Sequence, residues 1–206
     1  RFVTRIVIEI WDFVPKMGAG RKILMKNILI TGFGAFLKHD VNPAQEVALS
    51  LKKEGYDSVI LPVSYEGAIA AFKAIKNIKQ YDAVLSFGLA SSRHFISLET
   101  KAYNEMNAIH LDNDGVRKMG DPIVKGAPKE LSSPFNVPNL KEYLAKEGIE
   151  TELSSDPGRY ICNEVYYLDL SSGIPALFVH FPSLETSSIE KDEAAAKAIL
   201  AYLRTL

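Results

Sequence analysis

The pattern of hydrophobic and polar positions divides most of the chain into short apolar runs and amphipathic segments that alternate. Four apolar runs have the length and composition of buried strands: residues 27–32, 58–63, 82–88 and 176–181. Helices are predicted between them, because Val47, Ala48 and Leu51 recur at helical spacing after Asn42-Pro43, and a similar pattern spans residues 67–78. This alternation predicts an α/β fold with helices on both faces of a sheet.

The second half of the chain follows the same pattern less regularly. Residues 94–99 and 150–154 predict strands, and residues 139–148 and 161–170 predict helices. The stretch 104–126 is rich in Asn, Asp and Gly, which is typical of loops with short strands. Ser187 and Glu190 form a capping box that predicts the start of a long C-terminal helix.

The first strong strand follows Met25-Lys26 directly, which bears on domain organisation. We therefore place a single domain at residues 25–206 and interpret residues 1–24 as an N-terminal extension outside it. The extension is apolar in part but carries charges and lacks a small-residue cleavage site, so it does not have the pattern of a signal peptide.

Composition excludes several classes of function. The chain has 206 residues, of which 47% are hydrophobic and 24% charged, as expected for one globular domain. The net charge of −1 gives no general attraction to nucleic acid or to an anionic membrane, and no apolar stretch is long enough to span a bilayer. Cys162 is the only cysteine, so no intramolecular disulfide is possible and a reducing, cytoplasmic setting is expected.

Signals for a metal or a cofactor are weak. The sequence has no zinc-type spacing of Cys and His. Gly32 and Gly34 match the start of the dinucleotide-binding pattern G-x-G-x-x-G, but Leu37 occupies the place of its last glycine. We therefore expect neither a metal nor a cofactor.

Cys162 and His180 are the first candidates for chemistry. A thiol becomes a strong nucleophile when a neighbouring imidazole takes its proton. Cys162 is predicted in the first turn of a helix after the Gly158 turn, where free amides and the helix dipole favour a thiolate and suit an oxyanion. The alternative is an inert buried thiol and a core histidine, because free cysteine is among the most buried residue types.

Other side chains have open alternatives. Glu99 closes a predicted strand and is a candidate for orienting the imidazole, whereas a solvated strand-end charge is the simpler interpretation. Glu164, two residues after Cys162, is a rival for that role. Phe33 and Phe36 follow the first strand, and they either line a small apolar pocket or pack into the core.

Several motifs occur together in one order along the chain. They are Thr31-Gly32-Phe33-Gly34-Ala35-Phe36, Asn42-Pro43, Gly88-Leu89-Ala90-Ser91-Ser92-Arg93, Glu99 with Ala102 and Asn104, Asp112-Asn113-Asp114-Gly115, Gly158-Arg159-Tyr160-Ile161-Cys162-Asn163 and Val179-His180-Phe181-Pro182. In this order the motifs resemble those of pyroglutamyl peptidase I, a family of cysteine peptidases, from about Met25 to the C-terminus.

The resemblance implies both a fold and a reaction. The fold is a three-layer α/β/α sandwich with a mixed, mostly parallel central sheet. The reaction is removal of N-terminal pyroglutamate from peptides through a thioester acyl-enzyme. Carried onto this sequence, Cys162 is the nucleophile, His180 the base and then the acid, and Glu99 the orienting carboxylate. A homo-oligomer, either a tetramer or a dimer, is also implied.

The resemblance further assigns the substrate pocket and exposes departures from the family pattern. It implies that Phe33 and Phe36 are the walls of the pocket for the pyroglutamyl ring, that Asn42 makes a polar contact, and that further contacts come from Leu89 and Ile161. Ala35 replaces a common proline, Pro157 and Arg159 replace smaller or more neutral residues, and Ile109 stands near the place of a common arginine. These departures predict altered efficiency with the triad retained.

Two other functions fit parts of the pattern. One is a non-catalytic α/β binding module that keeps the pocket, although such a module has no use for Cys162, His180 and Glu99 together. The other is a thiol amidase of different acyl specificity, which differs in the shape of its pocket.

Overall fold

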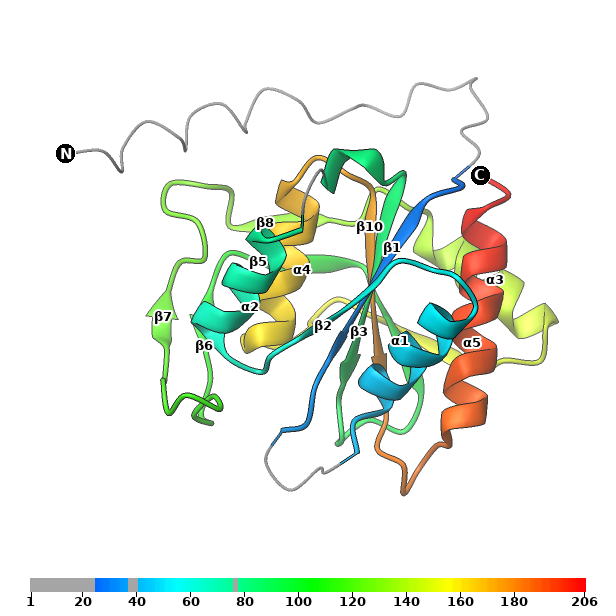
Figure 1. Ribbon diagram of the computed structural model, residues 1–206, viewed down its shortest axis with the longest axis horizontal. Coiled ribbons are helices and arrows are strands. Elements are labelled where there is room, and N and C mark those ends of the chain that lie inside the picture. Colours follow the sequence, from blue (N-terminus) through cyan, green and yellow to red (C-terminus); the bar gives the residue numbers. More distant parts are fainter. Residues whose placement is uncertain (1–24, 37–40, 76–77) are drawn as a thin grey trace.

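The computed structural model describes residues 25–36, 41–75 and 78–206 (Figure 1). Residues 1–24, and with them the predicted N-terminal extension, lie outside the described residues. In the described part of the chain, a six-stranded sheet has the order β2-β1-β3-β10-β4-β9. Its strands are β1 (Ile28–Phe33), β2 (Ser58–Leu61), β3 (Ala83–Leu89), β4 (Ile96–Glu99), β9 (Thr151–Ser154) and β10 (Ala176–Phe181). Neighbouring strands are parallel except β10 and β4, which are antiparallel.

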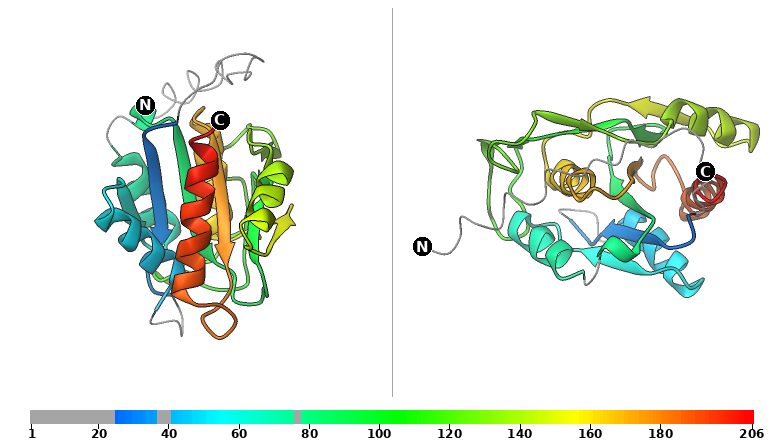
Figure 2. Two further views of the ribbon diagram at one scale, coloured as in Figure 1. Left: turned by 90° about the vertical axis from the view of Figure 1, so that its right-hand side faces the viewer. Right: turned by 90° about the horizontal axis from the view of Figure 1, so that it is seen from above.

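Helices cover both faces of this sheet, which confirms the three-layer α/β/α sandwich. The helices of the described residues are α1 (Pro43–Lys53), α2 (Tyr65–Lys73), α3 (Val137–Lys146), α4 (Ile161–Ser171) and α5 (Ile189–Leu203). The hydrophobic clusters place α1, α3 and α5 on one face and α2 and α4 on the other. Figure 2 shows α5 lying along the sheet.

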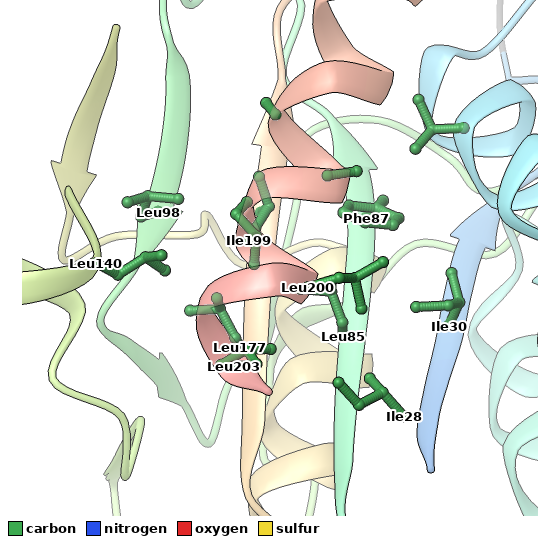
Figure 3. Close-up of a cluster of buried hydrophobic side chains, with 14 of the residues drawn as sticks. Ile28, Ile30, Leu85, Phe87, Leu98, Leu140, Leu177, Ile199, Leu200 and Leu203 are labelled. Carbon is green, nitrogen blue, oxygen red and sulfur yellow. The ribbon is translucent and has the colours of Figure 1, made fainter. Parts of the chain in front are cut away.

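Side chains from one strand alternate between the two cores because successive residues point to opposite faces. On β3, Leu85 and Phe87 enter the core under α5, whereas Val84 enters the core under α4. Figure 3 shows Ile199 and Leu200 of α5 over the strands of this first core. The central strands β1, β3 and β10 are therefore mostly apolar, which is why the sequence shows continuous apolar runs there.

Gly32 sets how closely α1 approaches β1. A Cβ atom at this position would collide with the carbonyl oxygen of Ala44 and lie 2.9 Å from the Cβ of Ala48. The helix that begins at Asn42-Pro43 therefore lies directly against the strand that ends at Phe33.

Some predicted boundaries were wrong because polar side chains cap the helices at other residues. α2 begins at Tyr65 rather than at residue 67, since the Ser64 side chain accepts a hydrogen bond from the Gly67 amide, and it ends at Lys73. The predicted capping box of Ser187 was wrong, because the Ser188 side chain accepts from the Lys191 amide while Ser187 donates to Asp192. α3 begins at Val137 because Asn136 caps it.

Two small sheets lie outside the central one. β5 (Lys101–Tyr103) pairs antiparallel with β8 (Glu130–Ser132), a pair that the sequence pattern did not predict. β6 (Met106–Asn107) pairs with β7 (Met119–Asp121), within the region predicted as loops with short strands. A short 3-10 helix, η1, spans Ile78–Gln80. None of the helices in the described ranges is long and apolar enough to cross a membrane.

Candidate active site

His180 and Glu99 meet across the antiparallel pair β10–β4. The register places Glu99 opposite Phe178, two residues from His180 on the same face of the sheet. The Nδ1 atom of His180 lies 2.8 Å from the Oε1 atom of Glu99, and both side chains are buried. Glu99 is therefore not a solvated strand-end charge, and the rival carboxylate Glu164 makes no such contact.

Protonation in this pair follows from its burial. Burial alone raises the pKa of Glu99, but the hydrogen bond and charge of His180, with help from Arg93, hold that pKa below its usual value. Burial lowers the pKa of His180 and outweighs the opposing effect of Glu99. The resting pair is thus a carboxylate and a neutral imidazole. Because a carboxylate only accepts hydrogen bonds, Nδ1 carries the proton and Nε2 is left as a free base.

Cys162 lies on the same face of the sheet as His180. His180 is paired in register with Gly88 of the parallel neighbour β3, so side chains at both positions point the same way. A Cβ atom added to Gly88 would lie 3.0 Å from the Sγ atom of Cys162 and 2.9 Å from the Phe178 ring. Gly88 therefore leaves the space in which the sulfur sits beside the histidine strand.

Cys162 is the second residue of α4, as predicted, but its thiol is not ionised at rest. Burial, followed by the negative charge of Glu99, raises the pKa of Cys162 to about 12. Arg93 and the backbone amide of Cys162 act in the opposite direction and do not overcome this. The backbone amide at the helix start thus acts toward the thiolate, as expected, but desolvation is the larger effect here.

The N-terminus of α4 lacks the side-chain cap that the other helices of the described residues have. Tyr160 is the N-cap residue and provides no side-chain hydrogen bond, whereas Asn42, Ser64 and Ser188 cap their helices. Gly158 precedes it in the left-handed region, at φ of 80°, and its amide donates to Asp156. First-turn amides that no cap occupies are suited to bind a negatively charged oxygen next to the sulfur.

An aromatic group lies near the turn 156–160 that precedes Cys162, called the nucleophile turn below, and it includes one of the two predicted pocket phenylalanines. Phe33 is buried with its ring centroid 6.4 Å from that of Phe178, so it packs into the core. Phe36 is half-buried and lies 5.3 Å from the ring of Tyr160. Tyr160 in turn contacts Tyr65 at 5.6 Å. Tyr160 was not among the predicted pocket residues, although its position two residues before Cys162 in the sequence could have indicated that it lies near the sulfur.

The remaining predicted contacts lie around this group. Ile161 is buried in the same cluster, and Leu89 is half-buried at the end of β3. Asn42 uses its side chain within the protein: Oδ1 accepts from the Ala44 amide, and Nδ2 donates to the Gly34 carbonyl. Asn42 thus joins Gly34 to the first turn of α1, and its contact with a substrate stays a prediction.

Comparisons with known proteins identify the family to which this chain belongs. The family model described as pyroglutamyl peptidase matches residues 26–203. A pyrrolidone-carboxylate peptidase of Pyrococcus furiosus is 34% identical over 176 residues, covering 80% of this chain and 84% of its relative. The crystal structure of the pyrrolidone carboxyl peptidase of Fervidobacterium islandicum superposes with a TM-score of 0.81 at 31% identity, covering 86% of this chain and 98% of the other. The chain belongs to the pyroglutamyl peptidase family.

Family membership makes the chain a peptidase. One residue that was named above only as part of a motif, Arg93, contacts Glu99. Arg93 donates from one guanidinium nitrogen to Glu99 Oε1 at 2.6 Å and from another to the Asp156 carbonyl at 2.8 Å. It therefore joins the carboxylate to the turn that precedes Cys162. The only signal was its place in Gly88-Leu89-Ala90-Ser91-Ser92-Arg93, because the contact partners are distant in sequence.

The departures from the family pattern have different structural settings. Ala35 is exposed, and its carbonyl accepts from Asn113. Ile109 is 80% exposed. Pro157 is a buried residue of the turn that precedes Cys162, whereas the half-buried Arg159 pairs with Glu105 and Asp156.

The other histidines lie apart from this site. His94 and His110 are exposed, and His39 falls outside the described residues. Among residues 25–36, 41–75 and 78–206, no three His, Cys, Asp or Glu side chains come together in a way that could hold a metal ion.

Proposed function

We propose that this chain removes N-terminal pyroglutamate from peptides with Cys162 as nucleophile, His180 as base and Glu99 as orienting carboxylate. Membership of the pyroglutamyl peptidase family supports the substrate. The 2.8 Å contact between His180 Nδ1 and Glu99, on the face of the sheet that also holds the sulfur, is the observation that carries the assignment.

The resting charges dictate how the reaction begins. Thiol and imidazole are both neutral, so the proton of Cys162 passes to Nε2 of His180 as the sulfur attacks the pyroglutamyl carbonyl. The imidazolium that forms is stabilised by the Glu99 carboxylate. The negative oxygen of the tetrahedral intermediate is placed at the free amides of the α4 start.

The second half of the reaction reverses the direction of the proton. The imidazolium gives its proton to the leaving amine as the carbon–nitrogen bond breaks, and a thioester remains on Cys162. Water then attacks this thioester, His180 accepts a proton from the water, and the thiol and pyroglutamate are released. Each charge in the cycle is therefore balanced within the Cys162, His180 and Glu99 group.

The pocket that we propose is apolar and suits an uncharged lactam ring. Phe36 supplies an aromatic face, Phe33 and Ile161 belong to the same hydrophobic cluster, and Leu89 at the end of β3 is a further candidate contact. We propose Asn42, whose side chain joins Gly34 to the first turn of α1, as a candidate polar contact to the ring. None of the residues that we assign to the ring contacts is a carboxylate, which suits an uncharged pyroglutamyl ring better than a prolyl ring with its charged nitrogen.

Hydrolysis of pyroglutamyl and prolyl 7-amido-4-methylcoumarin tests the proposal. Wild-type protein is expected to cleave the pyroglutamyl amide only, and Cys162→Ser is expected to lose the activity. A Ser variant that keeps full activity rules out Cys162 as nucleophile. Binding of the pyroglutamyl amide without turnover points to the binding module, and hydrolysis of other acyl amides in its place points to the thiol amidase.

We also propose a homo-oligomeric state, as the family resemblance implies, and a cytoplasmic location, as the single cysteine implies. Sedimentation equilibrium at several protein concentrations tests the first, since a mass equal to one chain at all of them contradicts it.

A further inference from the structure

Arg159 makes more contacts with the nucleophile turn than an exposed surface arginine ordinarily does. Its guanidinium pairs with Asp156 Oδ1 at 2.5 Å and with Glu105 Oε2 at 3.3 Å. It donates to the Gly158 carbonyl at 2.7 Å, and its Cζ atom lies 3.7 Å from the centre of the Tyr103 ring. One side chain thus joins two residues of the turn to the segment Tyr103–Glu105.

The segment Tyr103–Glu105 is itself fastened to the helix that carries the nucleophile. The Asn163 side chain accepts from the Tyr103 amide at 2.8 Å and donates to the carbonyls of Tyr103 and Glu105 at 2.8 and 2.9 Å. The Tyr103 hydroxyl donates to the Ser155 carbonyl at 2.9 Å. The segment Tyr103–Glu105 is therefore contacted by Arg159, which precedes Cys162 in the sequence, and by Asn163, which follows it.

Asp156 connects these contacts to the group of Cys162, His180 and Glu99. Its carboxylate binds Arg159, while its carbonyl accepts from Arg93, the residue that also binds Glu99. His180 and Glu99 are held by the central sheet, whereas Cys162 follows a turn that runs over the surface. The placement of the sulfur relative to the base therefore depends on how firmly the turn is held.

We propose that Arg159 is a positioning residue for the pyroglutamyl peptidase reaction, holding the turn 156–160 so that Cys162 reaches His180 in attacking geometry. The inference rests on the proposed role of Cys162. It also gives a role to Arg159, which departs from the expected family pattern. A planar guanidinium can pair with two carboxylates and stack on an aromatic ring at the same time, which a small neutral side chain cannot do.

The test compares Arg159→Met and Arg159→Lys with a matched control. The control is Lys101→Met, because Lys101 is similarly exposed (27% against 23% for Arg159), pairs with Glu130 at 3.0 Å and lies 6.0 Å from the same Tyr103 ring, but does not touch the turn. We expect Arg159→Met to lower kcat about 10- to 100-fold with little change in KM, because the reacting atoms are misplaced while the ring pocket is intact.

Three further readouts separate positioning from general destabilisation. Alkylation of Cys162 by iodoacetamide at fixed pH is expected to slow or quicken in Arg159→Met and to stay at the wild-type rate in Lys101→Met, at equal melting temperatures. Arg159→Lys, which keeps a point charge, is expected to recover part of kcat. Asp156→Asn combined with Arg159→Met is expected to cost no more than the larger single loss, since both act through one contact.

Unchanged kcat and alkylation in Arg159→Met overturn the inference, as does a loss that Lys101→Met reproduces or that follows the melting temperature alone. These results leave the proposed nucleophile standing, because that proposal fails only if Cys162→Ser remains active.

Discussion

At Cys162, burial and the helix start act on the thiol in opposite directions, and burial is the larger effect. The pKa of the thiol is raised to about 12, while that of His180 is lowered, so neither group carries charge at neutral pH. We therefore expect no pre-formed thiolate–imidazolium pair at rest. Charge appears only during the attack, where Glu99 and the α4 amides stabilise it.

This resting state predicts how the free enzyme reacts with iodoacetamide. Because only the thiolate reacts, the alkylation rate of Cys162 is expected to rise about tenfold per pH unit between pH 7 and 10. Mass spectrometry of the alkylated protein measures the rate, and Cys162→Ser reports labelling elsewhere. A rate that is constant from pH 6 to 9 indicates a pre-formed ion pair and contradicts the assignment.

Glu99 and Glu164 are both buried carboxyl groups. Comparing their variants separates the role of the Glu99 charge from the effect of changing any buried carboxyl group. Glu99→Gln removes the charge that balances the imidazolium, and kcat is expected to fall about a hundredfold or more. Glu164→Gln, on the nucleophile helix itself, is the control and is expected to keep wild-type kcat with pyroglutamyl amides. Equal losses in both variants contradict the placement of Glu99 beside His180.

At the scale of elements, the site depends on how closely α4 approaches β3. Gly88 provides this approach, because its missing side chain leaves the space filled by the Cys162 sulfur and the Phe178 ring. The register of β3 with β10 then places that space beside His180. A glycine in a strand interior is otherwise unfavourable, which is consistent with close approach as its role here.

Gly88→Ala is expected to abolish most of the activity by moving the sulfur. The added methyl group would lie 3.0 Å from Sγ and 2.9 Å from a buried ring, so one of them must shift. Overpacking of this kind costs about 1–3 kcal/mol of stability. Thermal unfolding and pyroglutamyl-amide hydrolysis are measured on the same preparation, and a folded variant with wild-type kcat contradicts the expectation.

At the scale of the whole molecule, buried carboxyl groups make stability depend on pH. Burial raises the pKa of Glu164 to about 8, that of Asp169 to about 7 and that of Asp192 to about 6. In each case the folded state holds a proton that the unfolded chain releases near pH 4. Stability from these groups is therefore present at low pH and is lost as pH rises through the folded-state values.

Glu164→Gln tests this dependence. In the wild type, Glu164 alone is expected to lower the free energy of unfolding by about 1.4 kcal/mol per pH unit between about pH 5 and 8, with no further loss above that range. Urea denaturation across this range is expected to show a flatter dependence in Glu164→Gln. Glu142→Gln, an exposed change on α3, is expected to keep the wild-type slope, and identical slopes in all three proteins contradict the prediction.

The order of strands and helices was largely predictable, because each element signals itself through nearby residues. The run Ala176–Phe181 was predicted with the bounds that the structure shows. Boundaries failed where caps lie outside the apolar pattern, as at Ser64 and Ser188. The β5–β8 pair failed because its strands are three residues each and find their partner across a long stretch of sequence.

The sequence by itself determined the α/β class, the family and the residues able to carry chemistry, since these depend on local periodicity and on motifs in order. Only the tertiary structure decided which carboxylate reaches His180, that desolvation raises the pKa of the Cys162 thiol, and which residues of the turn before Cys162 are contacted by Arg93 and Arg159. The reason is physical: hydrogen-bond geometry and desolvation depend on side chains brought together from distant parts of the chain, and no local pattern records them.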